Sequence, residues 1–280
     1  MTFAADSIRA RPDFGLTGAA RPGRPAQFHW WLGFFTAANS AALVLVLRHH
    51  PAAAVWAFFA PAPWLVWQLA VPSAGGFGPA ATTFAASGRE VWLTIDDGPD
   101  PATTPRMLDL LEAHGARATF FLIGTRAERH PDLVAGILRR GHTIGNHTLT
   151  HPCFSFWWAS GRRTADEIDA CAAVLRRAGA APPPWFRPPA GLKGLALHPQ
   201  LAARALPLVL WSVRSLDTLP FRAQTVVARL ARQIRPGAIV LLHESRPRSS
   251  HHVAILAGLL AHLAREGYVC VTPAADRLRA

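Results

Sequence analysis

Lysine and acidic residues are scarce in this chain of 280 residues, which leaves a strong excess of arginine. Lys193 is the one lysine among 29 basic residues, against 17 acidic residues, and the formal net charge is +12. The basic residues are scattered, whereas a nucleic-acid groove requires a basic stripe interleaved with aromatic residues, so we expect no nucleic-acid partner. A membrane surface or an anionic compound carried on a lipid is compatible with the charge.

Cysteine is scarce as well. The three cysteines, Cys153, Cys171 and Cys270, are far apart, so they form neither a disulfide framework nor a metal-binding CxxC pair. Only 16% of the residues are charged and 50% are hydrophobic, a composition that excludes intrinsic disorder. The length suits one large α/β domain with an appendage.

Two stretches near the N-terminus, 28–47 and 52–71, contain no Asp, Glu, Lys or Arg. Each has the length of about 20 residues that a membrane-spanning helix needs. Trp30 and Trp31 lie near the start of the first stretch, and Trp64 and Trp67 lie toward the end of the second, so a hairpin would bring both pairs to one side. Such pairs are typical of membrane interfaces. We predict a membrane hairpin over 28–72. A pair of buried helices capping the domain is the alternative, and a cleaved signal peptide fits less well.

Arginines near the N-terminus predict the orientation of this hairpin. The basic segment 1–27 contains Arg9, Arg11, Arg21 and Arg24, whereas the connecting loop has only Arg48. The positive-inside tendency then puts the N-terminus on the cytoplasmic side of a bacterial inner membrane, and two crossings return the chain to that side. If only one stretch spans, the remainder lies on the opposite side.

The rest of the chain divides into a linker and one domain. The Gly-rich, uncharged stretch 73–88 is predicted to be the linker. From residue 89 to 280, short apolar runs typical of buried strands alternate with helical stretches. The expected strands are 91–95, 118–123, 208–213, 238–242 and 268–272, and the expected helices are 104–114, 126–140, 164–178, 223–234 and 252–266. This alternation predicts a mostly parallel sheet, either open or closed into a barrel.

Two adjacent carboxylates, Asp96 and Asp97, follow the first expected strand. A turn is one interpretation, because Asp-Gly-Pro suits a turn. His147 and His151 are four residues apart, which would put both imidazoles on one face of a helical turn. Functional residues of parallel α/β folds gather at the carboxyl ends of strands, so these four side chains can converge. One carboxylate and two imidazoles are a ligand set for a catalytic metal, and the second carboxylate is then free to act as a base.

Three further strand ends carry ionisable residues. Arg187 begins a rigid Pro-Pro loop, Asp217 follows the expected strand 208–213, and His243 ends another strand. Each residue alone is compatible with a structural role. Their succession along the chain favours a catalytic site.

These motifs, in this order, resemble the NodB-homology polysaccharide deacetylases, carbohydrate esterase family 4, over about 89–280. Thr94-Ile95-Asp96-Asp97-Gly98-Pro99 resembles the T-F-D-D-G-P signature, and His147-Thr148-Leu149-Thr150-His151 matches H-S/T-x-x-H. Phe186-Arg187-Pro188-Pro189 matches the R-P-P loop, Asp217 the acid of the fourth motif, and Leu241-Leu242-His243 the final L-x-H. Arg117–Gly124, RATFFLIG, is similar to a recurrent strand of the family.

The resemblance implies a distorted (β/α)7 barrel and a divalent metal, usually Zn²⁺, bound by Asp97, His147 and His151. It implies that Asp96 is the general base and His243 the general acid. Arg187 and Asp217 would support them. The backbone N–H of Ala190 would lie in the oxyanion hole, although the family usually has Tyr at that position. Arg214 and Thr218 stand where the common pattern has Asp and Trp, so a surface for packing a sugar ring is missing.

We therefore predict a membrane-anchored, metal-dependent hydrolase that removes an N-acyl group, such as acetyl, from an amino sugar of a glycan. The alternative substrate is a lipid-linked sugar precursor carrying a formyl or acetyl group, because the hairpin and the altered fourth motif favour it. An alternative of a different class is a catalytically inactive barrel that binds glycans.

Overall fold

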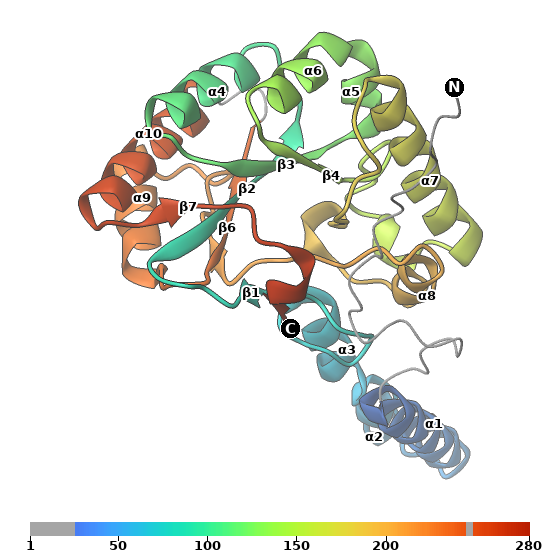
Figure 1. Cartoon of the computed structure of the whole chain (residues 1–280). Helices are drawn as coiled ribbons and strands as arrows, with labels where there is room; N and C mark the ends of the chain where they lie inside the picture. Colours follow the sequence, from blue (N-terminus) through green and yellow to red (C-terminus); the bar gives the residue numbers. More distant parts are fainter. Residues whose placement is uncertain (1–25, 245–248) are drawn as a thin grey trace.

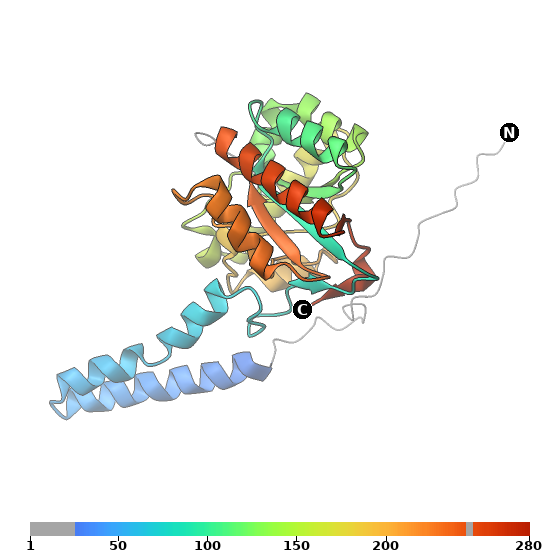
Figure 2. The same cartoon turned by 90° about the vertical axis from the view of Figure 1, so that its left-hand side faces the viewer.

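The computed structural model describes residues 26–244 and 249–280 (Figure 1). The four N-terminal arginines that predict the membrane orientation lie outside the described residues. The described chain begins with helix α1 (Ala26–Leu47), which is antiparallel to α2 (Pro51–Phe59). After α2 the chain continues through α3 (Ala62–Ala70) toward the body of the protein. Figure 2 shows α1 and α2 projecting away from that body, with α3 next to it.

The surface of the hairpin is apolar and mostly uncovered by protein. The side chains of Trp30 and Trp56 are 81% and 80% exposed. The windows Phe28–Leu47 and Pro51–Ala70 are both long and apolar enough to cross a membrane, and only 6% and 17% of their residues are buried. Membrane insertion of the two windows stays a prediction.

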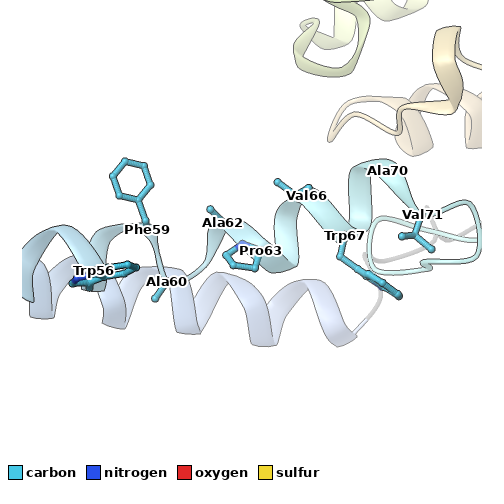
Figure 3. Close-up of a pocket in the computed structure, with 9 residues that line it drawn as sticks. All are labelled: Trp56, Phe59, Ala60, Ala62, Pro63, Val66, Trp67, Ala70 and Val71. Atoms are coloured by element: carbon cyan, nitrogen blue, oxygen red, sulfur yellow. The ribbon is translucent and has the colours of Figure 1, made fainter. Parts of the chain in front are cut away.

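The second window contains a kink at Ala60 and Pro61. Because Pro61 lacks an N–H donor, the regular helix is interrupted between α2 and α3, each of which has nine residues. An apolar groove of about 780 Å³ follows this kink along the outer side of the helices, from Trp56 past Pro63 to Val71 (Figure 3). Nine residues are too few to span a bilayer, so a second crossing requires α2 and α3 together.

A parallel sheet forms the centre of the domain. Its strand order is β4 (Thr143–Asn146), β3 (Ala118–Leu122), β2 (Glu90–Gly98), β6 (Ile239–His243) and β5 (Val213–Arg214), and β7 (Val269–Cys270) also pairs with β2. The strands carry apolar residues on both faces of the sheet, because helices surround it (Figure 1). The predicted α/β class with a parallel sheet is confirmed.

Closure of this sheet into a seven-stranded barrel stays a prediction. Beyond β4, single-residue bridges join Asn146 to Phe186 and Phe186 to Leu208. Of the expected strand 208–213, only Val213 lies in a named strand, β5, and Leu208 and Val209 contribute isolated bridges.

The helices of the domain are α4 (Thr104–Ala113), α5 (Gly124–Arg129), α6 (Pro131–Arg139), α7 (Gly161–Arg177), α8 (Leu197–Ala202), α9 (Ala223–Gln233) and α10 (Ser249–Arg265). The single helix expected over 126–140 is wrong. The segment forms two helices that divide at His130. This residue has non-helical dihedral angles (φ −134°, ψ 59°), because the following proline disfavours the helical conformation there.

The stretch 73–88, predicted to be a linker, packs on the domain instead of hanging free. Ala81 and Phe84 are 7% and 4% exposed and belong to a core cluster with Trp92 of β2. Strand β1 (Thr83–Phe84) pairs antiparallel with β8 (Leu278–Arg279) at the end of the chain. The small residues of this stretch allow the backbone to lie close to the domain.

Candidate active site

Asp96 and Asp97 end the central strand β2, and a β-bulge separates their side chains. The register between β2 and β3 shifts between Asp96 and Gly98, and Asp97 has the left-handed φ of 74°. A bulge inserts a residue that the partner strand does not match, which redirects its side chain. Asp96 therefore faces the buried interior, at 3% exposure, while Asp97 turns toward the two histidines.

The expected helical turn through His147 and His151 is wrong. The two residues lie in an irregular loop after β4, in which Thr148 and His151 have φ values of 66° and 55°. Asn146 holds this loop, since its side-chain oxygen accepts the N–H of Thr148 at 3.0 Å, and the Thr148 hydroxyl accepts the N–H of His151 at 3.1 Å. Side-chain hydrogen bonds, not helical periodicity, bring the imidazoles together.

Asp97, His147 and His151 form a cluster that could hold a metal ion. Their candidate ligand atoms all lie within 4.8 Å of one another. The Nε2 atoms of His147 and His151 are 3.4 Å and 3.2 Å from Asp97 Oδ1. His147 Nδ1 lies 2.8 Å from the Arg187 carbonyl oxygen and donates to it, which leaves Nε2 free to bind a metal. A carboxylate with two imidazoles fits a divalent transition metal.

The protonation states of this cluster suit a metal. Burial raises the pKa of the Asp97 carboxyl, but its hydrogen bond with His147 and the charges of His147 and His243 outweigh burial and hold the pKa well below its usual range. Burial and the charge of His147 lower the pKa of His151 to about 4. At neutral pH the cluster thus offers a carboxylate and a neutral His151 imidazole, the forms that bind metals.

Arg187 is completely buried beside Asp96. Its Nη1 donates to Asp96 Oδ1 at 2.7 Å and to the Thr94 hydroxyl at 2.8 Å. Its other donors reach the carbonyl oxygens of Val209 and Leu210. A buried charge is tolerated only when it is paired and hydrogen-bonded, and this guanidinium is both. Arg187 therefore holds one oxygen of Asp96, and the other oxygen, Oδ2, lies 3.9 Å from His147 Nε2.

Asp217 and His243 form a second buried pair. Asp217 Oδ1 accepts from His243 Nδ1 at 2.6 Å, and Oδ2 accepts the His243 backbone N–H at 2.8 Å. Burial lowers the pKa of His243, but the Asp217 carboxylate outweighs burial and raises it to about 9. The same attraction holds the pKa of Asp217 far below its usual range, against the effect of burial. His243 is thus a protonated imidazole at neutral pH.

Sequence reasoning missed two residues behind these pairs. His252, near the start of α10, is buried with Nδ1 at 3.6 Å from Asp217 Oδ2. Glu244 is completely buried, and burial raises its pKa to about 8. Its Oε2 accepts from the Thr104 hydroxyl at 2.5 Å. A Cβ on Gly98 would lie 1.8 Å from Glu244 Oε1, which explains the glycine. The one available signal was the position of Glu244 directly after His243.

Ala190 lies in the short 3₁₀ turn Pro189–Gly191, just after Arg187. It is exposed and has a left-handed φ of 54°. Gly191 follows with a φ of 70°, and a Cβ there would meet the Trp211 ring at 2.3 Å. The structure thus joins the Ala190 backbone to the Asp96 site through the buried Arg187.

Comparison with known proteins agrees with these motifs. Residues 85–206 match the family described as polysaccharide deacetylase. The chain is 37% identical over 182 residues to a peptidoglycan-N-acetylglucosamine deacetylase of Bacillus cereus, covering 64% of this chain and 84% of that protein. It is 38% identical over 160 residues to a chitooligosaccharide deacetylase of Bradyrhizobium, covering 57% and 72%. A solved family 4 carbohydrate esterase from Streptomyces lividans, in complex with acetate, is 28% identical with a TM-score of 0.62, covering 70% and 98%.

The cluster predicts metal binding that depends on His147. We expect His147→Ala to lose its stoichiometric divalent cation, because two remaining ligands hold a metal poorly. Elemental analysis after dialysis measures this. The control is His114→Ala, which changes an exposed histidine outside the cluster. Full occupancy in His147→Ala would show that the ligand set is wrong.

The Asp217–His243 pair predicts a shift in the titration of His243. In metal-free protein, NMR should give His243 a pKa of about 9, and Asp217→Asn should lower this pKa, because the largest attraction that opposes burial is removed and only the weaker ones of Asp97 and Asp96 remain. Since the folded pKa is raised, its stabilising effect is present below pH 6.5 and lost as the pH rises through 9. Unfolding measurements should show that loss in the wild type and not in Asp217→Asn. An unchanged His243 pKa in the variant would contradict the pairing.

Proposed function

The chain belongs to the polysaccharide deacetylase family with NodB homology, carbohydrate esterase family 4, and from this membership we propose that it deacetylates an amino sugar in a glycan. The family relationship predicted from the motifs is confirmed, and with it the enzyme class, a hydrolase of carbon–nitrogen bonds other than peptide bonds. The proposal extends this class to the roles of individual residues, a membrane anchor and an N-acetylated glycan substrate. The two relatives named above are deacetylases of such glycans.

One observation carries the residue roles: three groups of buried or partly buried side chains meet at the carboxyl ends of the strands. The cluster of Asp97, His147 and His151 lies beside Asp96, which Arg187 holds, and the backbone of His243 directly opposes Asp96 in the strand register. A cation held by the cluster would lower the pKa of a water and polarise the acyl carbonyl.

Asp96 is the general base of the proposed reaction. Arg187 engages Oδ1, so Oδ2 is the oxygen directed toward the cluster. Asp96 takes a proton from the attacking water as the water oxygen bonds to the acyl carbon. The guanidinium holds Asp96 in place and pairs its buried charge.

His243 is the general acid. Its Nδ1 is engaged by Asp217, so Nε2 is available to donate a proton to the sugar nitrogen as the C–N bond breaks. The products are the free amine and a carboxylic acid, acetate in the case of an acetyl group. The backbone N–H of Ala190 serves as a donor to the developing oxyanion, and it survives the absence of the usual tyrosine because it needs no side chain.

Membrane anchoring by residues 28–72 is the second part of the proposal. Its support is the exposed apolar surface of α1 and α2, which no other described part of the chain covers. A large uncovered apolar surface marks an interaction with lipid or with another protein. The match to the family begins at residue 85, so the hairpin lies outside it.

Asp96 has a test that separates it from the metal ligands. We expect Asp96→Asn to retain the metal and to lose activity on N-acetylated chito-oligosaccharides by about 10²–10⁴-fold, the usual contribution of a general base. Acetate release and elemental analysis measure the two properties on one sample. Asp132→Asn, an exposed carboxylate on α6, is the control. Unchanged turnover in Asp96→Asn would assign the base to another residue.

The hairpin predicts the side of the membrane on which the domain lies. If both stretches span, a fluorescent protein fused after Ala280 should be active in the cytoplasm, and alkaline phosphatase at the same position should be inactive. A cytoplasmic active site could not reach finished cell-wall polymer, so this result would favour a substrate that is still on its lipid carrier. Active phosphatase would mean that only one stretch spans, and it would favour exported glycans.

A further inference from the structure

Lys193, the one lysine of the chain, is completely buried where the hairpin meets the catalytic domain. Its Nζ donates to the carbonyl oxygens of Val71 at 2.7 Å, Pro72 at 3.3 Å and Ala74 at 2.5 Å. An ammonium has three N–H donors, so every donor has an acceptor. Complete pairing is what makes a buried charge tolerable.

The three acceptors follow the end of α3. Val71 is the C-terminal cap of that helix, and the Lys193 backbone N–H also reaches the Leu69 carbonyl oxygen at 3.4 Å. The carboxyl end of a helix has unpaired carbonyl groups and a partial negative charge, which a cation stabilises. Lys193 thus caps α3 from the catalytic domain.

Lys193 lies in the same loop as Ala190, three residues further along. This loop has little room to move: a Cβ on Gly194 would lie 2.2 Å from the Trp157 carbonyl oxygen, and Gly191 is equally close to Trp211. A tightly packed loop transmits a displacement instead of absorbing it. The end of α3 is therefore mechanically joined to the backbone at Ala190.

The other side of the junction is also fixed. Gln68, buried in α3, accepts the Gly76 N–H at 2.7 Å. The Phe77 ring packs between Trp64 and Phe28, with ring centroids 5.9 Å and 6.4 Å away. Hydrogen bonds and aromatic contacts therefore fix the segment from Val71 to Phe77, which is not a flexible linker.

The surface beside this junction is apolar. Phe154, Trp158 and Leu195 are 88%, 65% and 43% exposed. They belong to two loops that touch at Trp157 and Gly194, and one of these loops follows directly after His151 of the metal cluster. Exposed aromatic residues next to a membrane helix are typical of a surface at the level of lipid headgroups.

We propose that Lys193 is a positioning residue that locks the hairpin to the active-site loop, so that the site is held at the membrane surface and takes an amino sugar carried on a membrane lipid. The proposal rests on the proposed function and narrows its substrate class. A rigid junction fixes the height and direction of the site, which favours substrates presented in the same bilayer.

The test compares full-length wild type with Lys193→Met in vesicles of phosphatidylethanolamine and phosphatidylglycerol. One substrate is N-acetylglucosaminyl diphosphate polyprenol in the same vesicles, and the other is soluble chitopentaose. We expect Lys193→Met to lose at least about tenfold on the lipid-borne sugar and to keep its activity on the soluble one. Arg229→Met, which removes an exposed charge on α9, should resemble the wild type on both.

A second variant guards against misfolding of Lys193→Met. A flexible Gly-Ser insertion between Ala70 and Val71 leaves every residue of the catalytic domain unchanged but separates α3 from the carbonyl groups that Lys193 binds. It should show the same selective loss. Equal ratios of the two activities in the wild type, Lys193→Met and the insertion variant would overturn the proposal.

Hydrogen exchange measures the lock without any substrate. Peptides covering 70–80 should exchange faster in Lys193→Met, while peptides from β2 and β3 stay protected. Unchanged exchange over 70–80 would overturn the lock even if activity changed. Absence of turnover by the wild type on both sugars would instead overturn the proposed function, and the exchange experiment would still decide the role of Lys193.

Discussion

The buried ion pair between Arg187 and Asp96 is the interaction on which the candidate active site depends. The guanidinium binds Asp96 and Thr94 on β2 and two carbonyl groups of the segment before β5, and it lies 4.1 Å from the centre of the Phe121 ring on β3. The backbone carbonyl oxygen of Arg187 accepts a hydrogen bond from Nδ1 of His147. One side chain thus orients the proposed base, and its backbone orients a proposed metal ligand. Removing one partner of such a pair costs about 3–5 kcal/mol, because the other charge stays buried and unpaired.

Local backbone strain gives this site its geometry. Asp97, Thr148, His151 and Ala190 all have a left-handed φ, which side chains other than glycine adopt at a cost. Each of them is a proposed ligand, a proposed donor or the residue that orients a ligand. Surrounding hydrogen bonds and packing maintain these conformations, as those of Asn146 with Thr148 illustrate. The loops hold the functional atoms in place before substrate binds, which lowers the reorganisation needed for catalysis.

The two charged pairs at the site have different effects. Arg187 binds Oδ1 of Asp96 and fixes the orientation of that carboxylate, whereas Asp217 stabilises the protonated form of His243 and raises its pKa to about 9. The proposed acid therefore holds its proton at neutral pH, next to a proposed base that is already oriented. The hairpin adds a positional constraint, because Lys193 binds the segment that follows α3 and lies in the loop that contains Ala190.

The amino-acid sequence by itself determined the α/β class, the two long apolar stretches and the residues that converge. Buried strands read as apolar runs, and Asp96, Asp97 and His243 stand where such runs end, so the chain alone indicates that they meet. Tertiary structure decided how they meet. The bulge at Asp97, the irregular loop from His147 to His151 and the buried Lys193 all depend on contacts between residues far apart in the chain. Local periodicity contains no information on such contacts, which is why a helical turn was the natural expectation for His147 and His151.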